Sequence, residues 1–147
     1  MANVNSLKKD YQKIVDKHTP KNKVVSNTIK AFIVGGLFCC VGELLIDIYM
    51  MFGLAFAEAT TLSTDTMIFI GAVLTGLNVY DNIGKFAGAG ALVPITGFSN
   101  SMVSSGMEYK KEGYIYGLGA KLFTVAGPVI VFGTLISVVI GIVYYFI

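Results

Sequence analysis

The sequence has no arginine and no tryptophan, a single histidine and two cysteines, and charged residues make up only 14% of its 147 positions. Soluble domains average about 25% charged residues. This scarcity of charge, together with 54% hydrophobic residues, excludes a disordered chain, a nucleic-acid-binding arm and an ordinary soluble enzyme. A chain this short has too little interior to hide so much apolar surface, so lipid must be part of its solvent.

Motifs for catalysis and for ligand binding are also missing. The chain contains no His-Glu-x-x-His zinc motif, no phosphate-binding loop and no Gly-x-Ser-x-Gly nucleophile motif. Cys39 and Cys40 are adjacent and cannot form a disulfide framework. We therefore predict a protein that is not an enzyme and that carries no metal site and no cofactor.

The charges that are present lie mostly at one end. Residues 1–30 hold seven lysines against two acids, whereas the rest of the chain holds four lysines against seven acids. We expect a basic amphipathic head over 1–30, with a helix over 6–18, and a transmembrane domain over 31–147. The helix suits either the headgroup layer of an anionic membrane or the protein's own cytoplasmic face. Because lysine-rich segments stay in the cytoplasm, the N-terminus is predicted to be cytoplasmic.

Apolar runs of spanning length follow the head. We predict three full spans, near 31–57, 66–82 and 128–147. Residues 58–65 are expected to form a short external loop. Residues 83–106 are rich in glycine and serine and lack the bulky surface that faces lipid. Such backbone survives at membrane depth only when it is buried in protein or lines a watery cavity, so a re-entrant or broken helix is expected there.

Glycine and proline mark the expected breaks and close-packed segments. The residues are Gly88, Gly90, Pro94, Gly97, Gly127 and Pro128. Pro94 should break the helix over 86–106, and Gly127-Pro128 should divide the last apolar stretch into a half-helix and a full span. The predicted fold class is all-α: a polytopic membrane helix bundle with about three full spans plus one or two broken or re-entrant helices.

Two acids near the middle of the first span are the sharpest candidates for function. Glu43 and Asp47 lie four residues apart and hence on one helix face. A charge at the bilayer centre costs roughly 2.5–3.5 kcal/mol on insertion scales, so both acids should face the bundle interior or a second subunit. With Asn78 and Lys121 they form a candidate transport path. A structural polar network that locks helices together is the alternative.

The partners of these acids are predicted from small residues and from one lysine. The acid-bearing face also carries Gly36 and Cys40, which admit a close neighbouring helix. That neighbour is expected from 84–97 or 117–127, and Lys121 on the second segment is the expected cationic partner. Contact with an anionic substrate and snorkelling to the membrane surface are the other roles open to Lys121.

A series of ordered motifs runs through the second half of the chain. They are GAGALVPITGFSN over 88–100, MEYKKEG over 107–113, GAKLF over 119–123 and AGPVI over 126–130. In this combination the chain resembles the AC branch, SpoVAC, of the SpoVAC/SpoVAEB family of spore-forming Firmicutes. The basic head and the acidic first span are similar to that branch as well.

This resemblance implies a polytopic, channel-like protein of the inner forespore membrane, later the spore inner membrane. The family is implicated in moving dipicolinic acid, with calcium, into the developing spore and out of it during germination. Implied partners are the other SpoVA proteins, among them an AE-type membrane subunit and the soluble AD protein, together with the lipid bilayer and no nucleic acid. A non-conducting structural subunit that anchors partner SpoVA proteins is the alternative.

Overall fold

The computed structural model describes residues 8, 11–15, 17–18 and 23–147, and no strand occurs among them. The helices are α2 (Val24–Met51), α3 (Phe56–Gly76), α4 (Tyr80–Ala87), α5 (Ala89–Leu92), α6 (Ile95–Tyr109) and α7 (Ala120–Phe146), with a 3-10 turn (Lys110–Glu112) and a π-helical segment (Tyr114–Gly119) before α7. The all-α fold class is confirmed. Within the helix predicted over 6–18, the described residues 8, 11–15 and 17–18 are helical, and the rest lies outside the described residues.

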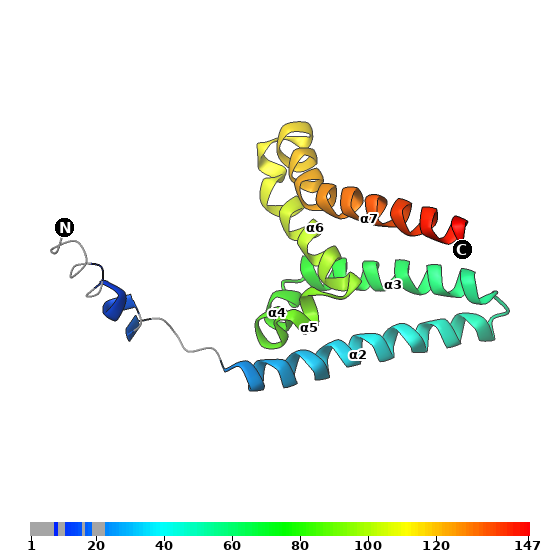
Figure 1. Cartoon of the computed structure of the whole chain (residues 1–147), viewed down its shortest axis with the longest axis horizontal. Helices are drawn as coiled ribbons and strands as arrows, with labels where there is room; N and C mark the ends of the chain where they lie inside the picture. Colours follow the sequence, from blue (N-terminus) through cyan, green and yellow to red (C-terminus); the bar gives the residue numbers. More distant parts are fainter. Residues whose placement is uncertain (1–7, 9–10, 16, 19–22) are drawn as a thin grey trace.

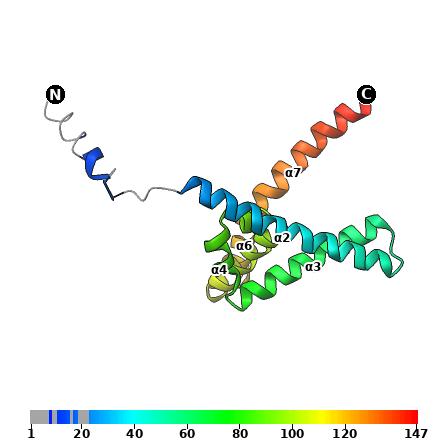
Figure 2. The same ribbon diagram turned by 90° about the horizontal axis from the view of Figure 1, so that it is seen from below.

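The helices form a long hairpin with a compact base. Helices α2 and α3 run antiparallel, while α4 and α5 lie against the first half of α2 (Figure 1). Helix α6 crosses α3, and α7 begins beside α6 and then extends away as a separate arm (Figure 2). Within the described residues, α2 and the stretch Tyr114–Phe146 are long and apolar enough to cross a membrane. Helices α3 and α4, bent by 102°, count as a third span only if taken as one broken element.

The predicted bounds of the first two spans are wrong. Helix α2 begins at Val24, inside the predicted head, and residues 58–65 belong to α3 instead of forming a loop. Most of these residues are polar, but their hydroxyl groups form hydrogen bonds with the backbone of their own helix. Thr60 and Thr64 each donate to the carbonyl four residues earlier, at 2.7 and 3.0 Å. At the helix start, the Glu58 carboxylate accepts a hydrogen bond from the backbone N–H of Ala55 at 3.2 Å. Helices α2 and α3 are therefore joined by a four-residue connection.

Three sharp changes of direction separate α3 from α6. Asn78 has a φ of 59°, a left-handed conformation that asparagine tolerates, and it turns the chain from α3 into α4. Gly88, with a φ of 54°, turns α4 into α5. Pro94 is extended and precedes the first turn of α6, so the predicted break there is confirmed. The segment 83–106 thus folds back on itself at the base of the hairpin.

The division predicted at Gly127-Pro128 is wrong, because α7 continues through both residues. Proline removes only one backbone donor from a helix of 27 residues. Helices in a membrane tolerate such a loss because neighbouring groups or local adjustment satisfy the freed carbonyl. The final stretch is therefore a single apolar rod of spanning length, preceded by a short π-helical segment.

The packed core lies along one row of α3 and in the base beneath it. The row repeats every four residues, through Ala59, Ser63, Met67, Gly71 and Thr75. In the base, Tyr80 is fully buried; its hydroxyl donates to the carbonyl oxygen of Ala91 at 2.7 Å and shares a second hydrogen bond with the Thr96 hydroxyl at 2.8 Å. A Cβ on Gly90 would overlap the backbone of Ala31, and one on Gly97 would overlap the carbonyls of Ala91 and Leu92. The base is therefore closed by direct backbone approach.

Candidate functional site

A cavity of about 390 Å³ lies between α2, α3 and the break at Pro94. Its polar lining consists of Glu43 on α2 and Thr60, Ser63 and Thr64 on α3. Apolar side chains and Pro94 with Ile95 complete the wall. A carboxylate, three hydroxyl groups and a broken helix thus meet at one place, where α2, α3 and the start of α6 come together.

The donors of this lining are already used. Ser63 donates to the carbonyl of Gly42 at 2.9 Å, which ties α3 to α2. Thr60 and Thr64 donate to carbonyls of their own helix. The hydroxyl lone pairs and the Glu43 carboxylate therefore present acceptor oxygens to the cavity. Such a lining suits a cation, a proton or a hydrated ion pair, and it repels a bare anion.

Asp47 does not share this position, although it lies one turn further along α2. Helix α2 packs through the row that carries Gly35, Gly42 and Tyr49: Gly35 lies against Gly90, and the Tyr49 hydroxyl lies 2.7 Å from the Thr66 hydroxyl. On a 3.6-residue helix Glu43 falls at the edge of that row and Asp47 beyond it. Both acids are exposed within this chain.

The expected neighbour of the acid-bearing face is also absent from the described chain. A Cβ on Gly36 would meet nothing within 4 Å there, and Cys40 is exposed. Of the two predicted surroundings, the bundle interior or a second subunit, the described chain does not supply the first, because it leaves both acids exposed. Their coverage by a second subunit stays a prediction.

Lys121 contacts an aromatic ring instead of the acids of α2. Its Nζ sits 4.2 Å from the centroid of the Tyr109 ring, at the junction of α6 with α7. Within the described residues no ion pair joins it to Glu43 or Asp47. The predicted pairing of Lys121 with these acids is therefore wrong for a single chain, and a cation–π contact takes its place.

Asn78 lines a second cavity, also of about 390 Å³, at the C-terminal end of α3. This cavity is shared with Asp81 and Glu108, and Asn78 itself is exposed at the turn. The structure therefore does not gather the four predicted path residues into one site. It places Glu43 in one cavity and Asn78 in another, with Asp47 and Lys121 outside both.

The three hydroxyl residues that join Glu43 were missed by the sequence prediction. Thr60, Ser63 and Thr64 fell in the segment interpreted as an external loop because of its polarity. Their spacing of three and four residues is the signal that could have placed them on one helical face. In a chain with few polar residues, that spacing carries more information than mean polarity.

Comparison with known proteins finds similarity to a family of sporulation membrane proteins. The sequence model of the SpoVAC/SpoVAEB sporulation membrane protein family matches residues 27–143. The chain is 44% identical over 142 residues to Stage V sporulation protein AC of Bacillus subtilis (strain 168), a match that covers 95% of this chain and 94% of that protein. No solved structure matches the chain significantly. The extent of both sequence matches shows that this chain belongs to the SpoVAC/SpoVAEB family of sporulation membrane proteins.

Proposed function

We propose that this chain is a channel or transport subunit of a SpoVA assembly. It moves dipicolinic acid, together with calcium, across the inner forespore membrane during sporulation and across the spore inner membrane during germination. The observation that carries the proposal is the placement of Glu43, an acid within a spanning helix, at a cavity beside the break at Pro94. Ionisable groups at membrane depth are costly and mark ion or substrate paths.

The chemistry of the cavity fits a cargo in which a cation accompanies the anion. Dipicolinate is an aromatic dianion, and Ca²⁺ binds through oxygen ligands, carboxylates above all. The Glu43 carboxylate and the hydroxyl oxygens of α3 can hold the cation. Ile95, at the N-terminal end of α6, lines the same cavity, and a helix N-terminus favours negative charge. Both members of an ion pair thus find complementary groups in the same cavity.

The experiment compares Glu43→Gln with Asp47→Asn in sporulating cells. Both substitutions remove one charge from α2, but only Glu43 lines the cavity. We expect Glu43→Gln to lower the dipicolinate and calcium content of spores several-fold, and Asp47→Asn to leave both near wild type. Membrane levels of each variant are measured in parallel. Normal uptake by Glu43→Gln at a normal protein level would refute a transport role for this cavity.

A second candidate is a non-conducting subunit that anchors other SpoVA proteins, namely an AE-type membrane subunit and the soluble AD protein. It is favoured by α7, none of whose 27 residues is buried by the described part of the chain. The two candidates differ in what Glu43→Gln does to the assembly. Loss of uptake with intact co-purification of the partners supports transport, whereas loss of co-purification supports anchoring.

Orientation in the membrane belongs to the same proposal. We propose a cytoplasmic N-terminus, because Lys23, Lys30 and Lys85 lie near one end of the molecule and lysine-rich ends stay in the cytoplasm. Single cysteines placed at Lys23 and Lys85, in a variant lacking Cys39 and Cys40, should react with a membrane-impermeant reagent only after the inner face is opened. Labelling of these cysteines from outside would show that the N-terminus lies outside and that the proposed orientation is wrong.

A further inference from the structure

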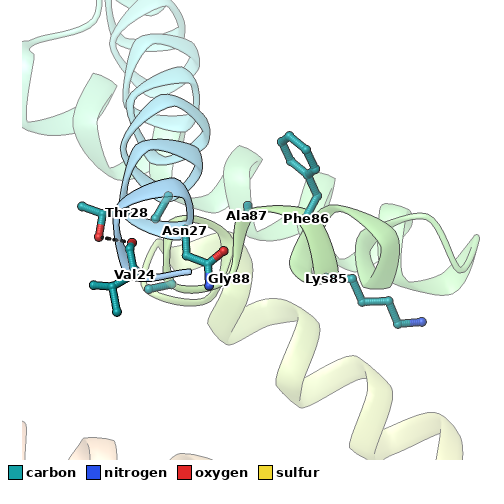
Figure 3. Close-up of a pocket in the computed structure, with 9 residues that line it drawn as sticks. Val24, Asn27, Thr28, Lys85, Phe86, Ala87 and Gly88 are labelled. Carbon is teal, nitrogen blue, oxygen red and sulfur yellow. Dashed lines mark hydrogen bonds between the residues drawn. The ribbon is translucent and has the colours of Figure 1, made fainter. Parts of the chain in front are cut away.

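A pocket of about 620 Å³ lies between the start of α2 and the turn from α4 to α5. Helix α2 contributes Val24, Asn27, Thr28 and Ala31, and the turn contributes 85–89. Figure 3 shows the Asn27 amide directed toward Gly88, while the Lys85 side chain points away from α2. This pocket is separate from the cavity at Glu43, which lies further along α2.

The positive charge at this pocket is not balanced by nearby acids. The Lys30 ammonium lies over the Phe86 ring, with its Nζ 4.8 Å from the ring centroid, and Phe86 lines the pocket. Asp81 is engaged by Lys85 in an ion pair of 2.5 Å. No acid occurs in α2 before Glu43. Within the described residues, Lys30 is therefore a cation held at the rim without a carboxylate partner.

The lining combines one amide donor with an apolar wall. The Thr28 hydroxyl donates to the Val24 carbonyl at 2.9 Å, so its proton is used within the helix. The Asn27 amide makes no such contact in the described chain and remains able to donate. Val24, Ala31 and Phe86 supply apolar surface beside it. A ligand that satisfies this pocket needs anionic oxygens at one end and an apolar body at the other.

The position of the pocket identifies the source of such a ligand. It lies at the first turns of a spanning helix, directly after the lysine-rich segment, which corresponds to the boundary between headgroups and hydrocarbon. Basic pockets between membrane helices at this depth bind anionic headgroups. A free phosphate would use Asn27 and Lys30 but would leave the apolar wall in water.

We propose that this pocket binds the phosphate of one anionic phospholipid. The Asn27 amide and the Lys30 ammonium donate to the phosphate oxygens, and Ala31 and Phe86 contact the glycerol and the first methylenes of the acyl chains. The inference is independent of the transport proposal, because it involves neither Glu43 nor the cavity beside Pro94. In this proposal, residues of α4 and α5 complete a lipid-binding site that begins on α2.

The test measures lipid retained by the purified full-length chain in detergent, by native mass spectrometry, during titration with phosphatidylglycerol or phosphatidylcholine. Three variants are compared with wild type: Lys30→Gln, Ala89→Leu, which fills the pocket from an exposed position, and the control Lys111→Gln on the exposed 3-10 turn. We expect one phosphatidylglycerol bound in preference to phosphatidylcholine. One lysine near a membrane surface is worth about 1 kcal/mol, so Lys30→Gln should weaken binding about fivefold and Lys111→Gln should change it less than twofold.

Several outcomes would overturn the proposal. Equal losses for Lys30→Gln and Lys111→Gln would indicate diffuse electrostatic attraction, and equal retention of the two lipids would exclude recognition of the anionic headgroup. Displacement of the lipid by millimolar glycerol 1-phosphate would assign the pocket to a free anion. Because Lys30 and Ala89 are not buried, melting temperatures close to wild type are expected for both variants, and Lys30→Gln alone decides the result if Ala89→Leu does not fold.

Discussion

Helices α3 and α7 have comparable lengths but opposite surroundings. Five residues of helix α3 are buried. Hydrogen bonds from hydroxyl groups join α3 to α2 and α6; one of them runs from the Ser99 hydroxyl to the Ile68 carbonyl at 2.7 Å. Helix α7 contacts α6 and the π-helical segment and then extends away from the hairpin (Figure 2), and none of its residues is buried by the described chain. Lipid is as apolar as leucine, so an apolar helix gains little by leaving lipid for protein. Small and polar residues, not hydrophobicity, decide which helices this chain holds together.

The largest expected difference concerns a glycine in each helix. A Cβ on Gly71 of α3 would lie 2.9 Å from the Thr96 carbonyl oxygen, whereas one on Gly133 of α7 would meet nothing within 4 Å in the described chain. We expect Gly71→Val to destabilise the fold by about 3 kcal/mol through overpacking, and Gly133→Val to have little effect. Thermal unfolding in detergent measures both. Equal tolerance at the two positions would break the comparison.

A smaller loss of stability is expected when the buried hydroxyl of Tyr80 is removed from the base, directly after α3. Tyr80→Phe leaves the Ala91 carbonyl without its hydrogen-bond donor, which should cost about 1–2 kcal/mol. Tyr144→Phe on α7 is the matched control, because Tyr144 is 84% exposed. Unfolding midpoints in the same detergent compare the two variants. A Tyr80→Phe chain as stable as the control would mean that the hydroxyl network does not hold the base.

The seam between α3 and α6 offers a finer comparison. Ser99→Ala removes the hydrogen bond to Ile68 and should cost about 0.6 kcal/mol, the average for such contacts between membrane helices. Ser137→Ala on α7 removes a hydroxyl that is exposed in this chain and should cost less. Repeating both substitutions in the assembled complex sharpens the result. If Ser137→Ala then becomes the costlier change, α7 is held by another subunit.

The smallest effect is expected at the proline of α7. Because α7 continues through Pro128 and membrane helices satisfy a carbonyl freed by proline through neighbouring groups or local adjustment, Pro128→Ala should leave the helical content unchanged and shift stability by less than about 0.5 kcal/mol. Circular dichroism measures the first quantity and thermal unfolding the second. An increase in helical signal equivalent to a full turn would show that the proline divides the helix after all.

Composition and proline placement were sufficient to predict the fold class and the break at Pro94. A mean hydropathy of +0.70 requires a membrane, and Pro94 lies in a segment rich in glycine and serine, whose backbone is tolerated at membrane depth only when it is buried in protein or lines a watery cavity. The start of α3 was not predictable from polarity, because Glu58 and Thr60 satisfy helical backbone groups instead of competing with them. Proline was equally ambiguous, because Pro94 separates two helices whereas Pro128 lies inside one.

The site was harder to predict, because α2 offers two faces with small residues. One carries Gly36 with both acids, and the other carries Gly35 and Gly42. The chain uses the second, since Gly35 meets the backbone of α5 and Gly42 accepts a hydrogen bond from α3. The sequence of α2 alone does not indicate which of these two faces packs against the rest of the chain. The choice depends on where α3 and α5 lie, which is a property of the whole chain.

The approach of Gly90 to Ala31 restricts how this sequence can change over evolutionary time. The atoms that would overlap a Cβ at position 90 belong to the backbone of α2, and every amino acid has them. No second substitution at position 31 can therefore make room. Any descendant that keeps α5 against α2 keeps glycine at 90, whereas Gly133 and Gly141 are free to drift unless another protein comes to lie against them.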